Sequence, residues 1–205
     1  MIEGIFCLFL AYAAGSFPSG LVIGNVFYHT DIRTEGSHNT GATNAYRVLG
    51  KAGGLAVLIL DITKGILGVW LGQQAGMLIA PDQIELCMIG GGLLAILGHS
   101  CSLFMKFKGG KGVATGLGVI LYLAPWETFI VFAVWCIIVA FTRIVSLGSI
   151  VAAILVPVTM YLFHEPFEIV VFGVLAAAFV IIRHRANIVR LLHGNELKVE
   201  RIHKK

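Results

Sequence analysis

Long runs of apolar residues alternate with short polar segments along the whole chain. A helix needs roughly 20 residues to cross a hydrocarbon core about 30 Å thick, so each run is a candidate membrane helix. Unbroken apolar runs disfavour a membrane β-barrel, whose strands alternate apolar and polar residues. The seven runs are Gly4–Gly24, Gly53–Gln73, Glu85–Gly98, Gly112–Pro125, Phe129–Thr142, Ser146–Phe163 and Glu168–Ile182. They predict an all-α polytopic membrane protein with seven transmembrane helices.

Several of these runs are shorter than an ordinary membrane span, and the third to fifth must borrow flanking residues or lie where the bilayer is thin. The first run has an alternative interpretation as a cleaved signal peptide. It carries Glu3 and lacks the basic segment that precedes the apolar part of a signal peptide. A membrane helix is therefore the favoured interpretation of this run.

Lysine and arginine concentrate on one side of the predicted membrane. Apart from Lys64, they all fall in the segments 25–52 and 99–111, at Arg143, or in the tail 183–205. The opposite side carries acidic residues instead. Positively charged loops stay in the cytoplasm. We therefore expect the N-terminus outside and the C-terminus in the cytoplasm, which agrees with an odd number of crossings.

Composition points the same way, because 58% of the residues are hydrophobic and only 13% are charged. About a quarter of the residues of a soluble domain are charged. The formal charge of +4 forms no stripe for nucleic acid. The four cysteines show no C-x-x-C spacing, and the seven histidines no H-x-x-x-H pair, so we expect no disulfide framework, metal or cofactor. No linker divides the chain, which predicts a single domain over residues 1–205.

Asp61 and Lys64 are ionisable residues inside the second apolar run. Their spacing of three places both on one face of a helix. Charges in lipid are costly, so the two are expected to pair toward the interior of the bundle. A structural ion pair is the simplest interpretation, and a supporting role near a functional site is the alternative.

The first polar segment, Thr34–Arg47, is dense in hydroxyls, amides and glycines and ends in an arginine. Non-helical backbone persists near a membrane only where protein or water satisfies it. The segment therefore lines a cavity or caps the bundle, although a solvated loop has a similar composition.

The second polar segment, Lys106–Thr115, leads directly into the fourth apolar run. Consecutive glycines let backbone N–H groups converge on an anion, the following helix adds its positive end, and Lys111 adds a full charge. The spacing differs from that of a nucleotide P-loop, so a phosphate that is not a nucleotide is the favoured ligand. The candidate residues are Gly109, Gly110, Lys111, Gly112 and Thr115.

Two further polar clusters, Thr142–Ser149 and Arg183–Asn187, lie on the same predicted side. Ser146 and Ser149 could simply cap the next helix. The arginines could anchor a helix at the headgroups, which does not explain His184. Together the four clusters offer cations and neutral donors but few carboxylates. They suit anionic substrates and not a two-carboxylate hydrolase or a Ser-His-Asp triad.

Five ordered motifs span nearly the whole chain: Gly15–Gly20, Gly36–Asn44 with Arg47, Gly98 and His99 with Phe107–Thr115, Arg143 with Ser146–Ser149, and Arg183 and His184 with Asn187 and Glu196. In these motifs the sequence resembles the bacterial acyl-phosphate:glycerol-3-phosphate acyltransferases of the PlsY type. Departures occur at His38 and Thr40, where the family typically has glycine and proline, and at Ser102, where proline is usual. They bear on loop rigidity.

The resemblance implies seven membrane helices, a cytoplasmic active site in the bacterial inner membrane, and transfer of a fatty acyl group from acyl phosphate to the 1-position of glycerol 3-phosphate. The product is lysophosphatidic acid, in the first step of phospholipid synthesis. We expect a monomer whose partners are its two substrates and membrane lipid. The residues expected to be catalytic are Lys111, His184, Ser149 and Arg47. Those expected to bind substrate are Ser37, Asn39, Thr43, Asn44, Gly109, Gly110, Gly112, Thr115, Ser146, Asn187 and Glu196.

One mechanistic point and the class of function stay open at this stage. The proton of the attacking hydroxyl could go to His184 or, as we favour, to the phosphate of the substrate. The function itself has two competitors from other classes. A small transporter for a phosphorylated metabolite would need a polar path through the membrane, and a purely structural protein would leave the phosphate-type segments unexplained.

Overall fold

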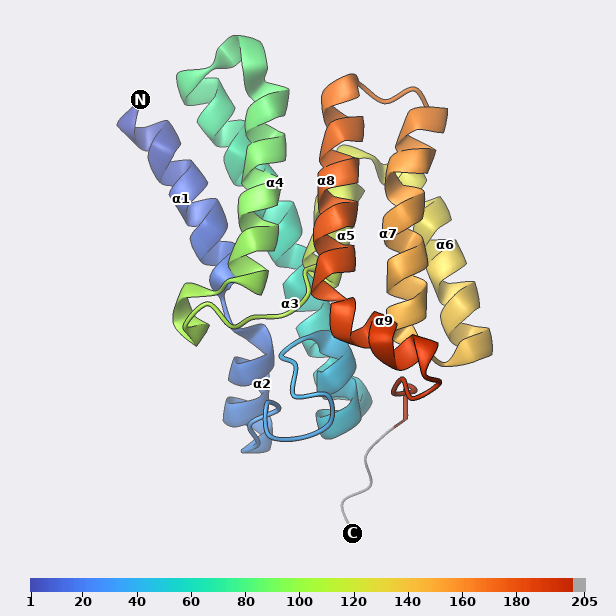
Figure 1. The fold of residues 1–205 in the computed structure, drawn as a ribbon. Helices are drawn as coiled ribbons and strands as arrows, with labels where there is room; N and C mark the ends of the chain where they lie inside the picture. The colour runs from blue at the N-terminus through green and yellow to red at the C-terminus, as the bar shows by residue number, and fades with distance from the viewer. Residues whose placement is uncertain (201–205) are drawn as a thin grey trace. The chain divides into compact units, whose positions relative to one another are not determined.

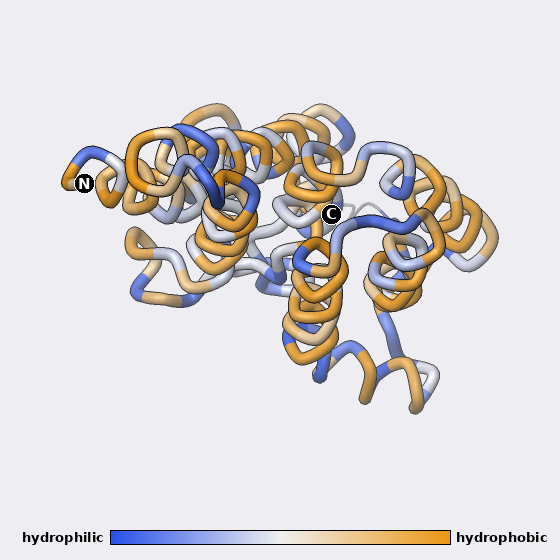
Figure 2. The backbone as a smooth tube through the Cα atoms, turned by 90° about the horizontal axis from the view of Figure 1, so that it is seen from above, coloured by the Kyte–Doolittle hydropathy of each residue, from blue (hydrophilic) through white to orange (hydrophobic). Residues whose placement is uncertain are grey.

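The computed structural model describes residues 1–200, which form nine α-helices and two short 3-10 helices (Figure 1). The helices are α1 (Ile2–Ser16), α2 (Ser19–Tyr28), α3 (Ala42–Ile79), η1 (Pro81–Gln83), α4 (Ile84–Ser100), η2 (Leu103–Met105), α5 (Val113–Leu123), α6 (Pro125–Thr142), α7 (Val145–Leu162), α8 (Phe167–Arg183) and α9 (Arg185–Leu192). Each predicted apolar run lies mostly in helix, which confirms the all-α class. Figure 2 shows hydrophobic residues along the helices and hydrophilic residues mainly in the connecting segments.

Within residues 1–200, four helical segments are long and apolar enough to cross a membrane: Ala42–Ile79, Pro81–Met105, Pro125–Thr142 and Val145–Leu162. The number rises to six if the bent pairs α1 with α2 (47°) and α8 with α9 (61°) each form one span. α5 is apolar but has only 11 residues. The pattern is that of a multi-pass membrane protein, and seven crossings with the N-terminus outside stay a prediction.

The chain folds into two compact units, Met1–Val119 and Ile120–Val199, whose boundary falls within α5. A single domain over residues 1–205 stays a prediction. In the first unit, α1, α3 and α4 pack against one another through glycines. A side chain at Gly91 would overlap the Gly68 carbonyl of α3, and one at Gly15 would overlap the Ala95 carbonyl of α4. Small residues allow this close approach of backbones, which is a common way to pack helices in a membrane.

Two predicted helix boundaries in the first unit are wrong. The first run is not continuous, because α1 ends at Ser16 and α2 begins at Ser19. Pro18 lacks an N–H group and disfavours helical backbone at the residue before it, Phe17. The second helix starts at Ala42, eleven positions before its predicted start at Gly53. It is kinked at Gly50, whose φ of 85° suits glycine.

In the second unit, α7 packs against both α6 and α8. Each of these helices contributes buried apolar residues, such as Val131, Met160 and Phe172. Gly173 of α8 lies close to α7, since a Cβ there would be 2.7 Å from the Met160 Sδ. The chain turns at His184 into α9, an amphipathic helix that leaves α8 at 61°.

Candidate active site

Asn44, in the first turn of α3, organises the preceding loop. Its Oδ1 accepts a hydrogen bond from the Ser37 N–H at 2.8 Å. Its Nδ2 lies within hydrogen-bonding distance of the carbonyls of Ile32 (2.7 Å), Asn39 (2.9 Å) and Glu35 (3.2 Å). The residue is only 1% exposed. Both polar atoms of this side chain therefore form hydrogen bonds with the loop backbone, so Asn44 fixes the conformation of the segment that carries Ser37 and Asn39.

The sequence departure at His38 has a local explanation. His38 has a φ of 57°, in the left-handed region that favours glycine but that histidine also enters. Its Nδ1 lies 2.9 Å from the Arg33 carbonyl, which ties the residue to the start of the loop. Arg33 also pairs with Asp31 at 2.7 Å, and its hydrogen bonds lower the pKa of that carboxyl. The loop is thus fixed by contacts of its own side chains.

Arg47 and Thr43 were predicted in a non-helical segment, and the structure places both in helix α3 before the kink at Gly50. Their spacing of four puts them on one face of this short helical stretch. Arg47 is buried and Thr43 half-buried. A helix holds the guanidinium more firmly than the expected loop would.

The glycine-lysine turn, Gly109–Gly112, packs against the end of α4. The Gly109 N–H donates to the Ser100 carbonyl at 3.0 Å, and the Gly110 N–H donates to the His99 carbonyl at 3.1 Å. A Cβ on Gly109 would overlap the His99 carbonyl oxygen, so glycine permits this approach. The two N–H groups are therefore committed to α4, contrary to the expected role of converging on an anion.

The feature of this segment that best suits an anion is instead the N-terminus of α5. The helical ladder begins where the Gly116 N–H donates to the Gly112 carbonyl at 2.7 Å, and Gly112 itself has a φ of 82°. The first N–H groups of a helix have no partner within it, and the helix dipole makes them attractive to anions. Lys111 precedes this end directly.

Two buried hydroxyls among the predicted binding residues have no hydrogen-bond partner within residues 1–200. They are Thr115 Oγ1, in the first turn of α5, and Ser146 Oγ, in the first turn of α7. Unsatisfied buried polar groups are uncommon in folded proteins. These hydroxyls are therefore the clearest candidates for ligand contacts in their respective units.

Ser149 is placed differently from Ser146. Its Oγ donates to the Val145 carbonyl at 2.9 Å and accepts from the Trp135 Nε1 at 3.4 Å. The hydroxyl is thus already hydrogen-bonded within the second unit, which weighs against a role as a nucleophile. The alternative that these serines cap α7 is wrong, because the cap residue is Ile144 and no side chain caps the helix.

His184 lies buried at the junction of α8 and α9. Its Nδ1 is 2.8 Å from the Val180 carbonyl. A carbonyl can only accept, so Nδ1 carries the proton and the neutral ring keeps its lone pair on Nε2. A backbone carbonyl one turn earlier therefore orients this ring, a partner that a search for nearby carboxylates misses. The exposed His193 makes the same contact with Val189, so the contact alone does not mark a catalytic residue.

Glu196 holds Asn187 in place. Its Oε1 accepts from the Asn187 Nδ2 at 2.7 Å, and its Oε2 accepts from the Arg190 Nε at 2.8 Å. Both carboxylate oxygens are thus engaged by the protein, and Glu196 positions Asn187, although it was expected to contact substrate. Arg190 was missed at the sequence level, where only its spacing of three from Asn187 on a helix could have indicated it.

Each unit thus carries its own group of predicted site residues. The first unit holds Ser37, Asn39, Thr43, Asn44, Arg47, Gly109, Gly110, Lys111, Gly112 and Thr115. The second unit holds Ser146, Ser149, His184, Asn187 and Glu196. The first group is basic and includes a helix N-terminus, whereas the second includes an imidazole, an amide and hydroxyls.

Comparison with known proteins gives consistent matches over nearly the full length. Residues 5–194 match the family model for glycerol-3-phosphate acyltransferase. A glycerol-3-phosphate acyltransferase of Fusobacterium nucleatum is 46% identical over 94% of this chain and 97% of its own. Glycerol-3-phosphate acyltransferase 2 of Moorella thermoacetica is also 46% identical, over 95% of this chain and 97% of its own.

Two solved structures share the fold. Both are crystal structures of PlsY, an integral membrane glycerol 3-phosphate acyltransferase. The glycerol 3-phosphate form has a TM-score of 0.86 and 37% identity and covers 96% of both chains. The lysophosphatidic acid form has a TM-score of 0.83 and 36% identity, over 95% of this chain and 94% of that one. The fold and the matches define a bacterial multi-pass membrane acyltransferase. More narrowly, the chain belongs to the PlsY-type glycerol-3-phosphate acyltransferase family.

Proposed function

We propose that this protein transfers a fatty acyl group from acyl phosphate to the 1-hydroxyl of glycerol 3-phosphate. The products are lysophosphatidic acid and inorganic phosphate, in the first step of phospholipid synthesis. The observation that carries the proposal is the likeness to PlsY structures in glycerol 3-phosphate and lysophosphatidic acid forms, at TM-scores of 0.86 and 0.83. Those two molecules differ by one acyl group, so they are the acceptor and the product of such a transfer.

The choice of acyl phosphate as donor is supported by the chemistry of the site. An acyl phosphate is a mixed anhydride, so the acceptor hydroxyl can attack its carbonyl carbon directly. The C–O bond to phosphate then breaks and inorganic phosphate leaves. No activated nucleophile is needed, in keeping with a Ser149 hydroxyl already bonded to Val145 and Trp135. Proximity of the two substrates can supply roughly 7 to 11 kcal/mol of the barrier.

We assign the phosphate of the donor to Lys111 and the N-terminus of α5, with the Thr115 hydroxyl in support. Within the first unit, glycerol 3-phosphate is assigned to Arg47 with Lys111 and Ser37. Arg47 suits this role because a guanidinium binds phosphate through two parallel hydrogen bonds. These assignments give each anion at least one cation.

The proton of the attacking hydroxyl goes, in our proposal, to the phosphate of glycerol 3-phosphate. The second pKa of such a monoester is about 6, so the dianion is an adequate base at neutral pH. His184 then acts as a hydrogen-bonding residue and not as the base. Its lone pair on Nε2 keeps it as the alternative base.

We place the protein in the bacterial inner membrane as a monomer, with the reaction on the cytoplasmic side. The support is the distribution of lysine and arginine, which favours the cytoplasm for every candidate segment. On this side the water-soluble acceptor comes from the cytosol, and the acyl chain enters laterally from the inner leaflet.

The test uses purified protein, palmitoyl phosphate and glycerol 3-phosphate, with phosphate and lysophosphatidic acid both measured. We expect equal amounts of the two products. A parallel reaction with palmitoyl-CoA should give no product, and turnover with the thioester but not the acyl phosphate would overturn the assigned donor. Accumulation of glycerol 3-phosphate in sealed vesicles without product would favour the transporter.

A further inference from the structure

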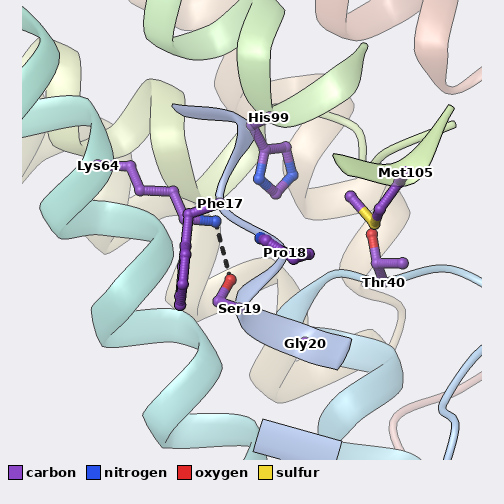
Figure 3. Close-up of a pocket in the computed structure, with 8 residues that line it drawn as sticks. All are labelled: Phe17, Pro18, Ser19, Gly20, Thr40, Lys64, His99 and Met105. Carbon is purple, nitrogen blue, oxygen red and sulfur yellow. Dashed lines mark hydrogen bonds between the residues drawn. The ribbon is translucent and has the colours of Figure 1, made fainter. Parts of the chain in front are cut away.

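A buried polar cluster joins three sequence features that the proposed reaction leaves unused: the Gly15–Gly20 motif, the intramembrane pair Asp61 and Lys64, and His99. We call Ser19, Asp61, Lys64 and His99 the buried cluster. All four residues lie in the first unit and are at most 6% exposed. They line or adjoin a small pocket with Phe17, Thr40 and Met105 on its walls (Figure 3).

Asp61 is the centre of the buried cluster. Its Oδ1 accepts hydrogen bonds from the Ser19 hydroxyl and, at 2.6 Å, from the Lys64 ammonium. Lys64 also donates to Ser19 Oγ at 2.9 Å (Figure 3). The His99 Nδ1 lies 3.6 Å from the same oxygen, an electrostatic contact longer than a hydrogen bond. Asp61 Oδ2 has no hydrogen-bond partner within residues 1–200.

Stability alone is a poor explanation for this arrangement. Desolvating two charges costs about as much as their attraction returns, and apolar residues of the same volume often serve a fold equally well. A buried ionic group fixes one geometry more strictly than an apolar contact does, because its partners must stay within bonding distance. The buried cluster is therefore better suited to positioning than to adding stability.

The element held most closely by the buried cluster is the glycine-lysine turn. A Cβ on Gly110 would overlap the His99 Nε2, so Gly110 lies directly against the imidazole ring. The Gly110 N–H also donates to the His99 carbonyl at 3.1 Å. Asp61 thus contacts one side of the ring, and the turn that leads to Lys111 packs against the other.

The same cluster reaches the Asn44-ordered loop. Ser19 opens helix α2, and its neighbour Gly20 lies against that loop, since a Cβ there would overlap the Thr40 carbonyl oxygen. The loop and the turn are the two segments to which the proposed function assigns phosphates. The loop packs against Gly20, the neighbour of Ser19, and the turn packs against His99.

We propose that Ser19, Asp61, Lys64 and His99 are positioning residues, which hold the glycine-lysine turn and its Lys111 in register for the phosphate of the donor. The functional part of this proposal rests on the proposed function. The positional part rests only on contacts within the first unit. The two parts are tested by separate measurements.

The main variant is the double substitution Asp61→Leu with Lys64→Met, which removes both charges together and leaves no unpaired ion in the bundle. We expect it to fold with nearly unchanged thermal stability. The KM for palmitoyl phosphate should rise at least tenfold, and the KM for glycerol 3-phosphate should rise as well, because Lys111 and the loop that carries Ser37 are also assigned to this acceptor. His99→Phe, which keeps a ring but removes both nitrogens, should shift the donor KM in the same direction by a smaller factor.

The second measurement is amide hydrogen exchange of the peptide covering residues 101–115, in detergent and without substrates. The hydrogen bonds of Gly109 and Gly110 should slow exchange in the natural protein, and the double variant should exchange there at least tenfold faster. Ile89→Ala is the control, because Ile89 is buried in the same helix α4 but lies far along it from the turn. It should lower the melting temperature without changing either readout.

A double variant with unchanged donor KM and unchanged exchange overturns the proposal and leaves the buried cluster a structural feature. Faster exchange with an unchanged donor KM overturns the functional part, since the turn would then be held without consequence for the donor. If the natural protein does not use palmitoyl phosphate at all, the proposed donor fails. The exchange measurement still decides whether the buried cluster holds the turn.

Discussion

The glycine-lysine turn and the junction of α8 with α9 hold their polar groups in different ways. In the turn, Gly109 and Gly110 bond backbone to backbone with the end of α4, where no side chain fits between them. At the junction, His184 and Asn187 are oriented by a carbonyl one turn away and by Glu196. The turn therefore tolerates almost no added volume, whereas the junction depends on individual hydrogen bonds. The effects of substitutions should differ accordingly.

The largest effect is expected at Lys111, the charged end of the turn. Lys111→Ala should lower kcat/KM for palmitoyl phosphate about 100- to 1,000-fold, as removal of one preorganised charge-stabilising group does in other enzymes. Steady-state kinetics on purified protein measures this change. The exposed Lys108 of the same segment is the control, and Lys108→Ala should stay within twofold. A near-normal rate for Lys111→Ala would remove its role at the phosphate.

The next effect tests the volume limit of the turn. Gly109→Ala places a methyl group into the His99 carbonyl and should displace Lys111, with a loss of about 100-fold in kcat/KM for a shift near 1 Å. The matched control is Gly90→Ala in α4, where a Cβ meets nothing within 4 Å. That change should stabilise the helix by roughly 0.5–1 kcal/mol, seen as a higher melting temperature, and leave activity unchanged. Equal kcat/KM values for the Gly109 and Gly90 variants would contradict the close packing of the turn against α4.

A smaller effect is expected at the junction. If the phosphate of the substrate takes the proton, His184→Ala loses one hydrogen bond and about tenfold in kcat. The rate should still fall below a pH of about 6 in this variant, because the substrate phosphate is protonated there. His193→Ala removes a histidine with the same backbone contact in an exposed position and should change nothing. A loss beyond a thousandfold with intact glycerol 3-phosphate binding would make His184 the base.

The smallest effect concerns Glu196. Glu196→Gln keeps the shape but weakens the charge-assisted bond to Arg190, whose side chain is partly exposed. We expect the KM for glycerol 3-phosphate to rise about threefold, in the range of a partly exposed ion pair. Glu200→Gln, an exposed neighbour, is the control. A loss as large as that of Lys111→Ala would mean that the junction is as rigid as the turn.

The helical class and the positions of most helices follow from the sequence, because long apolar runs leave few alternatives. The family was also readable from its ordered motifs. The helical start of α3 was missed because Thr43, Asn44 and Arg47 lie in a segment rich in turn-forming residues, and Gly50 hides the continuity with the apolar run. Local composition describes this segment poorly, since the loop hydrogen bonds of Asn44 fix its geometry.

At the site, residue types pointed to anion chemistry, but the partners of those residues did not follow from the sequence. The N–H groups of Gly109 and Gly110 are bonded to residues about ten positions earlier, and a spacing pattern cannot show that. The contact of His99 with Asp61 joins residues that are far apart in sequence, on the consecutive helices α3 and α4. The pairing of Asp61 with Lys64, in contrast, was predictable because both residues lie on one helix and their spacing fixes it.

The bend of 61° between α8 and α9 has a consequence for how the protein responds to its lipid environment. The short helix exposes Val189 and Leu192 and also carries Arg185 and Arg190. Such a combination is typical of helices that lie at the level of the lipid headgroups. Because Asn187 belongs to this helix, we expect turnover to depend on bilayer thickness, with an optimum in nanodiscs as the lipid tails are lengthened.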